Sequence, residues 1–338
     1  MSDRTLPSRL LRFAATALFF LLLFLSASAA RAQLSAETVL GAIVGLESKI
    51  PADARSAATL GTTRSGSGVV IDDKGLILTI GYLTLEAEEI AVTTSHGRTL
   101  PAAQVAYSSE TGFGLVRAQG DLAATPMPIG SAETLEDGEA VLVAGFGGVS
   151  AVRPAIVAGQ REFAGPWEYL IDKAIFTTPP HPAHSGAGLI GGDGRLIGIG
   201  YLLVGNALET GEHVLPGNMF VPVDLLKPIL ADLVATGRSP GPPRPWLGLY
   251  SAEAKGRLLV DRVAAGGPAE AAGLQAGDIV LAVGGEPVGS MADLYRKVWA
   301  RGSAGVAVPL TVLQGMELRE VTVRSADRSR WFKTPRTL

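Results

Sequence analysis

One serine of this chain lies where a hydroxyl group could act as a nucleophile. Ser185 is the serine of the small-residue run AHSGAGL, and the apolar runs LIG and LIGIGY follow it on either side of a GDG turn. This pattern predicts a β-hairpin directly behind an exposed hydroxyl. Such a turn lets Oγ stand clear of the backbone while neighbouring N–H groups point at the oxyanion that attack on a carbonyl creates. The chemistry indicated is acyl transfer, provided that a base activates the serine.

The four histidines give little support for such a base. His96 falls in a predicted hairpin turn, and His184 is adjacent to Ser185, where neighbouring side chains diverge. His181 and His213 cannot be placed from the sequence. The HPAH run does not indicate a metal site, because its prolines disfavour the helix on which two imidazoles could share an ion, and no cofactor is expected. A lysine base stays open, although no S-x-x-K spacing supports one.

Composition limits the class of protein to which Ser185 can belong. The chain has 338 residues, of which 47% are hydrophobic and 18% charged, enough to bury the cores of about two domains. A net charge of −3 and the lack of a basic stripe argue against a nucleic-acid partner. Cysteine is absent, which excludes disulfides, thiolate metal sites and a cysteine nucleophile.

The first 32 residues resemble a secretory signal. Three arginines precede the apolar run from Phe13 to Leu25, and an Ala-Arg-Ala pattern ends at Ala32. We therefore expect a signal peptide over residues 1–32 and a secreted or periplasmic protein. The alternative is an uncleaved anchor in the inner membrane, for which the apolar stretch is short.

The rest of the chain divides into a strand-rich half, a linker and a second unit. Short apolar runs separated by DDKG, SHG, EDG and GDG turns predict an all-β barrel or sandwich, after a short helix near residues 35–40. Apolar residues at helical spacing follow, and they predict a helix with Asp224 as its N-cap and Gly237 as its end. Residues 238–245 form a proline-rich linker. Residues 246–326 predict two strands, a short helix, a strand, a helix capped by Ser290 and a closing hairpin, before a tail over residues 327–338.

Both halves contain runs of residues that point to one family. GPAEAAGLQAGDIVLAVGGEPV and WLGL in the second unit, with GSGVVID, GRLIGI and MFVPVDLL in the first, resemble the HtrA (Deg) family of exported trypsin-like serine proteases with a PDZ domain. The resemblance implies a mostly β protein, with a trypsin-like double six-stranded β-barrel over residues 33–237 and a smaller PDZ domain, a β-sandwich plus helices. It also implies a homotrimer, although nothing between residues 33 and 61 identifies the contact.

The catalytic residues of the family carry over only in part. LTIGYL matches its histidine motif and puts Tyr82 at the base position, while TGFGL puts Gly112 at the aspartate position. AHSGAGL keeps the nucleophile as Ser185, and the backbone N–H groups of Ala183 and Ser185 match the oxyanion hole. Tyrosine, with a pKa near 10, is protonated at neutral pH and cannot replace histidine. We predict a pseudoprotease; the alternatives are a serine endopeptidase with an unconventional base and a purely structural envelope subunit.

The PDZ-like unit keeps the parts that its family uses to bind peptides. PDZ domains bind extended peptides along a strand and hold the terminal carboxylate with successive backbone N–H groups. The expected partners are polypeptide C-termini or unfolded proteins, in envelope protein quality control. The resemblance assigns the carboxylate to the N–H groups of Leu247, Gly248 and Leu249 and the apolar pocket to Met291, Tyr295 and Val298.

Overall fold

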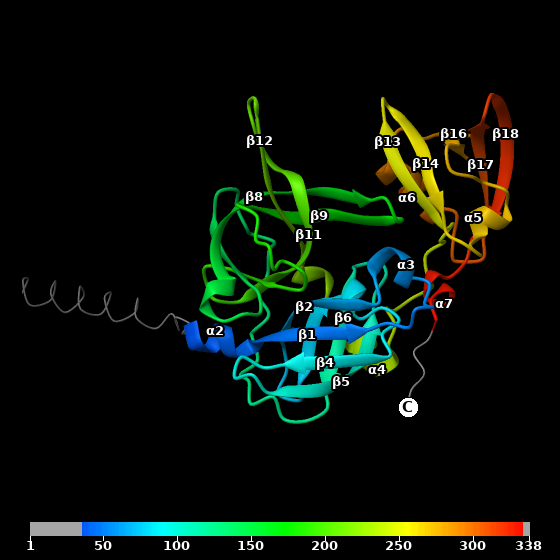
Figure 1. Ribbon diagram of the computed structural model, residues 1–338. Helices are drawn as coiled ribbons and strands as arrows, with labels where there is room; N and C mark the ends of the chain where they lie inside the picture. Colours follow the sequence, from blue (N-terminus) through cyan, green and yellow to red (C-terminus); the bar gives the residue numbers. More distant parts are fainter. Residues whose placement is uncertain (1–35, 334–338) are drawn as a thin grey trace, which may run out of the picture.

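The computed structural model describes residues 36–333, so the expected signal peptide lies outside the described residues. A short helix, α2 (Ala36–Ala42), leads into two closed six-stranded barrels and then a six-stranded PDZ sheet (Figure 1). The predicted fold class, a double barrel followed by a smaller PDZ domain, is therefore confirmed.

The first barrel is an antiparallel ring in the order β1-β2-β3-β6-β5-β4. Its interior is apolar because alternate residues of each strand point inward, and Ile77, Val92 and Val116 are fully buried there. Two short helical segments interrupt it, α3 (Ala57–Leu60) and the 3-10 turn η1 (Gly81–Leu83). The strands are β1 (Ile43–Lys49), β2 (Thr63–Val70), β3 (Leu76–Ile80), β4 (Glu89–Thr93), β5 (Thr99–Tyr107) and β6 (Phe113–Ala118).

The second barrel has the corresponding order, β10-β11-β12-β9-β8-β7. The hairpin predicted behind Ser185 is present as β10 and β11, joined by the GDG turn. Two other hairpins extend beyond the barrel, β8–β9 toward the PDZ domain and β11–β12 away from the barrel (Figure 1). The strands are β7 (Ala140–Ala144), β8 (Val152–Gly165), β9 (Tyr169–Thr178), β10 (Gly188–Ile190), β11 (Leu196–Thr210) and β12 (His213–Pro222), with a 3-10 turn, η2 (Val149–Ala151), before β8.

The helix predicted to begin at Asp224 is broken, so its expected N-cap is wrong. A 3-10 turn, η3 (Val223–Leu225), is followed by α4 (Leu230–Thr236), which ends at Gly237 as predicted. Pro228 lacks an N–H, and in a helix its ring would clash with the carbonyl of Asp224 four residues earlier. The Asp224 carboxylate instead accepts hydrogen bonds from the Ser131 hydroxyl and the Ala132 N–H, both at 2.7 Å.

The PDZ domain follows the predicted order of elements. Ser290 caps the longer helix as expected, because its Oγ accepts a hydrogen bond from the Asp293 N–H at 3.1 Å. The elements are β13 (Leu249–Ala254), β14 (Arg257–Val263), α5 (Pro268–Ala271), β15 (Ile279–Val283), β16 (Glu286–Pro287), α6 (Met291–Trp299), β17 (Ala307–Gln314) and β18 (Glu317–Arg324).

The segment after the PDZ domain returns to the first barrel. It contains α7 (Arg328–Trp331), which lies beside α3 in Figure 1. The Arg55 guanidinium lies 4.7 Å from the centre of the Trp331 ring, and the Lys333 N–H donates to Glu86 Oε1 at 2.8 Å. The described part of the expected tail is thus folded against the barrel. Within residues 36–333, no helix has the length and apolar character needed to cross a membrane.

Candidate functional site

The structure brings Tyr82 and Ser185 together across the interface of the two barrels. Tyr82 lies on η1, directly after β3, and Ser185 lies in the turn before β10. The Tyr82 hydroxyl donates a hydrogen bond to Ser185 Oγ at 2.6 Å. The turn itself is fixed by the Ser185 carbonyl, which accepts the Ser67 N–H at 2.8 Å. A phenol thus occupies the place next to the serine that a general base would need.

The environment of Tyr82 keeps its hydroxyl protonated. Its ring stacks on Tyr201 with centroids 5.7 Å apart. Burial raises the pKa of Tyr82, and the hydrogen bond to Ser185 only partly opposes this. At neutral pH Tyr82 is therefore a donor to Ser185 Oγ and does not accept its proton.

Gly112 occupies a backbone conformation and a space that do not suit an aspartate. Its φ of +81° lies in the left-handed region, where a Cβ is strained. A Cβ placed there would lie 3.1 Å from the Tyr169 hydroxyl, which donates to the Thr111 carbonyl at 2.7 Å. An aromatic side chain thus fills the side of the site where a carboxylate would orient the base.

The N–H of Ala183 is engaged in a hydrogen bond within its own turn. It donates to His181 Nδ1 at 3.1 Å, and the His181 N–H donates to Asn218 Oδ1 at 2.6 Å. Burial lowers the pKa of His181, which keeps the imidazole neutral and Nδ1 able to accept. In this conformation the Ala183 N–H is held by His181 instead of pointing at an oxyanion.

In the part of the chain that the structure describes, the other three histidines make no hydrogen bond to the Ser185 hydroxyl. His184 Nδ1 is 3.2 Å from the His181 carbonyl. His96 lies in the exposed turn between β4 and β5, as predicted, and His213 begins β12 in an exposed hairpin.

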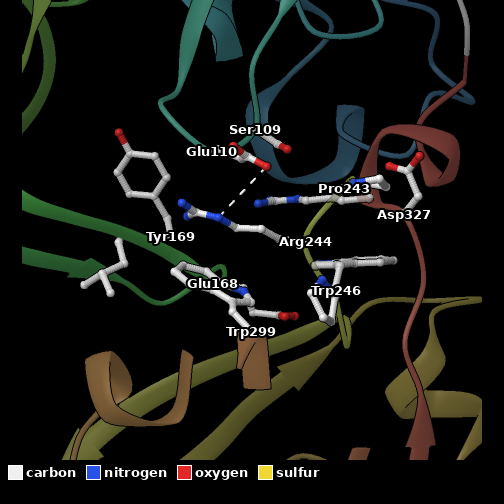
Figure 2. Close-up of a pocket in the computed structure, with 12 residues that line it drawn as sticks. Ser109, Glu110, Glu168, Tyr169, Pro243, Arg244, Trp246, Trp299 and Asp327 are labelled. Atoms are coloured by element: carbon white, nitrogen blue, oxygen red, sulfur yellow. Dashed lines mark ion pairs between the residues drawn. The ribbon is translucent and has the colours of Figure 1, made fainter. Parts of the chain in front are cut away.

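A cluster of aromatic rings leads from the serine to the turn between β8 and β9. Tyr201, which stacks on Tyr82, also contacts Tyr169 and Trp167, with centroids 5.3 Å and 5.8 Å away. Trp167 and Tyr169 stack on each other at 5.8 Å. Residues 167 and 169 flank Glu168, whose carboxylate binds the PDZ domain on the side away from the Tyr169 ring (Figure 2).

Glu168 occupies the loop that the sequence assigned to a peptide carboxylate. Its Oε1 accepts the N–H groups of Gly248 at 2.7 Å and Leu249 at 2.9 Å, and its Oε2 accepts that of Leu247 at 2.9 Å. The three predicted donors therefore converge on one carboxylate. Sequence reasoning missed Glu168, because it is about 80 residues from the loop and only a Gly-Pro-Trp turn precedes it.

Two of the three residues predicted for the apolar pocket line the PDZ core, and Tyr295 also contacts the hairpin. Tyr295 and Val298 are buried, whereas Met291 is only partly buried. The Tyr295 hydroxyl donates to the Gly165 carbonyl at 2.7 Å and accepts the Glu168 N–H at 3.3 Å.

Burial raises the pKa of Glu168 to about 6, against the opposing influence of the three N–H donors and Arg328. A carboxyl group whose pKa is raised on folding stabilises the folded protein at low pH. The stabilisation is complete at pH values below 4.5, the pKa in the unfolded chain, and disappears as the pH rises through 6, the pKa in the folded protein. We expect the free-energy advantage of the wild type over Glu168→Gln to grow by about 1 kcal/mol between pH 8 and pH 5. Urea unfolding of both proteins at each pH measures this; a constant difference would contradict it.

Comparison with known proteins identifies both domains. The trypsin-like peptidase domain model matches residues 66–199, and the PDZ domain model matches residues 259–314. HhoA of Synechocystis sp., described as a serine protease, is 28% identical over 298 residues, covering 78% of this chain and 70% of HhoA. A DegP-like protein of Halomonas elongata, described as a periplasmic serine endoprotease, is 30% identical over 278 residues and covers 78% of this chain. This chain spans 56% of the Halomonas protein.

Solved structures show the same fold. The HtrA-type protease AlgW with a decapeptide has a TM-score of 0.51 and 21% identity, covering 89% of this chain and 99% of that one. A serine endoprotease from Yersinia pestis has a TM-score of 0.50 and 23% identity, covering 87% of this chain and 98% of that one. The two barrels and the PDZ domain therefore occur together in solved structures.

Proposed function

For this chain of the HtrA/DegP type, a trypsin-like peptidase domain followed by a PDZ domain, we propose a peptide-binding role without proteolysis. The hydrogen bond from the Tyr82 hydroxyl to Ser185 Oγ carries the proposal. A serine hydroxyl becomes nucleophilic when a neighbouring base takes its proton. Tyr82 donates a proton to this oxygen in a hydrogen bond and has a raised pKa.

Two further observations support the loss of catalysis. Gly112 provides no carboxylate, and its surroundings are filled by Tyr169. The Ala183 N–H is bonded to His181, so stabilising an oxyanion there would require the turn to rearrange. Each of these features removes one of the contributions on which acyl transfer by serine depends.

The binding role is assigned to the PDZ domain. Leu247, Gly248 and Leu249 present three N–H groups to one carboxylate, which is the arrangement a peptide C-terminus requires. We propose free polypeptide C-termini and unfolded proteins as partners, in the periplasm that the Halomonas relative's description names, and a part in envelope protein quality control.

The test is degradation of an unfolded protein. Purified residues 33–338 are incubated with reduced, unfolded β-casein beside a Ser185→Ala variant. We expect both proteins to leave casein intact over the period in which trypsin digests it fully, because no base activates Ser185. Degradation by the wild type that Ser185→Ala abolishes would replace the proposal with its alternative, a serine endopeptidase with an unconventional base.

A further inference from the structure

The carboxylate loop of the PDZ domain is occupied by this chain's own hairpin. The tip between β8 and β9, residues 164–170, extends from the second barrel to the PDZ domain (Figure 1). Glu168 is buried, and its two carboxylate oxygens take the N–H groups of three successive residues, 247–249. A peptide C-terminus also presents two equivalent oxygens, so the Glu168 side chain uses the same donors as the terminal carboxylate would.

The backbone of the hairpin tip also pairs with the PDZ strand. The Ser251 N–H, on β13, donates to the Pro166 carbonyl at 2.9 Å. The Tyr295 hydroxyl, on α6, binds the Gly165 carbonyl at 2.7 Å. The tip thus lies between β13 and α6, where an added peptide strand would receive its main-chain hydrogen bonds.

An apolar residue of the same hairpin completes the contact. Leu170 has 8% of its surface exposed and belongs to the hydrophobic core of the PDZ domain, with Ala164 packed against the same core. Carboxylate, main-chain pairing and an apolar side chain are the three components of PDZ recognition, and the hairpin provides all of them.

Backbone strain indicates that the position of Glu168 depends on these contacts. Its φ is +57°, in the left-handed region that favours glycine. A glutamate persists in such a conformation when its surroundings determine it. The nearby ion pairs of Arg296 with Glu162 and Asp172, at 2.5 Å, are solvent-exposed, so they contribute little. The buried carboxylate contact is the stronger attachment.

We propose that the hairpin tip is an internal ligand of the PDZ domain, which competes with C-terminal peptides and keeps the groove closed until the tip leaves. This inference rests on the proposed function, because it concerns access to the same groove. A peptide that binds only the open form has its affinity reduced by the fraction of molecules that are open. Glu168 therefore sets how readily the protein captures a C-terminus.

Two variants isolate the carboxylate. Glu168→Gly removes it and also relieves the positive φ, so the fold is expected to tolerate the change. Glu168→Gln keeps the side-chain length but loses the charge, and a smaller effect in the same direction is expected. Glu212→Gly is the matched control, because Glu212 is an exposed glutamate in the turn between β11 and β12.

The experiment uses residues 33–338 and two readouts. Hydrogen–deuterium exchange follows the amides of Leu247, Gly248 and Leu249, and binding is measured to an array of decapeptides with apolar C-terminal residues, each as free carboxylate and as carboxamide. We expect Glu168→Gly to exchange these amides at least tenfold faster than the wild type and to bind free carboxylates at least tenfold more tightly, with Glu212→Gly matching the wild type.

The outcomes separate the two proposals. If the three amides exchange equally fast in the wild type and in Glu168→Gly, the internal-ligand proposal is overturned. It is also overturned if the wild type and Glu168→Gly bind the same peptides with equal affinity, and peptide binding by the PDZ domain then stands. If Glu168→Gly loses amide protection but neither protein binds any peptide, the internal ligand is supported and the proposed function fails.

Discussion

Gly112→Asp is expected to lower the free energy of unfolding by about 3 kcal/mol, although it introduces the residue type of a catalytic triad. A side chain at φ +81° costs about 1 kcal/mol for a residue such as aspartate, which tolerates the left-handed region better than most. Crowding against the Tyr169 hydroxyl, 3.1 Å from the new Cβ, and burial of a carboxylate add about 2 kcal/mol. Urea unfolding monitored by tryptophan fluorescence measures the total loss in the free energy of unfolding.

Gly97→Asp separates backbone strain from crowding in this test. Gly97 has nearly the same φ, +80°, but lies in an exposed turn where a Cβ would meet no atom within 4 Å. Its substitution should therefore cost about 1 kcal/mol. If Gly112→Asp costs no more than Gly97→Asp, the conclusion that Tyr169 fills the carboxylate position is incorrect. If the difference is found, restoring the triad would require changes at Tyr169 as well.

Arg64→Met is expected to lower the free energy of unfolding by about 4 kcal/mol. Arg64 is 5% exposed, and its guanidinium donates to the carbonyls of Tyr82 at 2.7 Å and Leu85 at 2.9 Å and to the Ser56 hydroxyl at 2.8 Å. Burial lowers its pKa to about 10, so it stays charged at neutral pH and balances the buried Glu86. Methionine has a similar length but leaves these three acceptors without their donor and removes the positive charge that balances Glu86.

Arg98→Met provides the control for arginine loss at the surface. Arg98 is exposed and makes a hydrogen bond to the Asp121 carbonyl at 3.0 Å, so its replacement should cost about 0.5 kcal/mol. Thermal or urea unfolding of both variants tests the difference. Similar small losses in both would mean that Arg64 does not hold the segment that carries Tyr82.

The fold could be predicted because its signals are local and repeated. Alternating apolar residues and glycine-containing turns indicated the barrels, and the PDZ elements followed in the expected order. The helix at Asp224 was predicted too long, since apolar spacing continued through Pro228 and outweighed the effect of that proline. In this case the backbone chemistry of one residue decided the boundary.

The candidate site could be predicted only at the positions that align with the catalytic motifs of the HtrA family. The resemblance placed Tyr82 and Gly112 at the base and carboxylate positions, and the structure brings Tyr82 to Ser185. The bonds that define the site could not be predicted. The contact of Ala183 with His181 depends on the rotamer of one imidazole, and that of Glu168 with the PDZ loop joins segments about 80 residues apart. Neither contact is signalled by a periodicity or a characteristic spacing of residues in the sequence.

Labelling with a fluorophosphonate probe tests the central claim, an unactivated Ser185, most directly. The probe reacts with activated serines and needs no knowledge of the substrate. Residues 33–338, the Ser185→Ala variant and trypsin as a positive control are treated in parallel, and bound probe is detected after denaturing electrophoresis. The hydrogen bond from Tyr82 predicts labelled trypsin and equal, background signals for the wild type and Ser185→Ala. Labelling of the wild type that Ser185→Ala abolishes would show that a base activates Ser185 and would contradict the account.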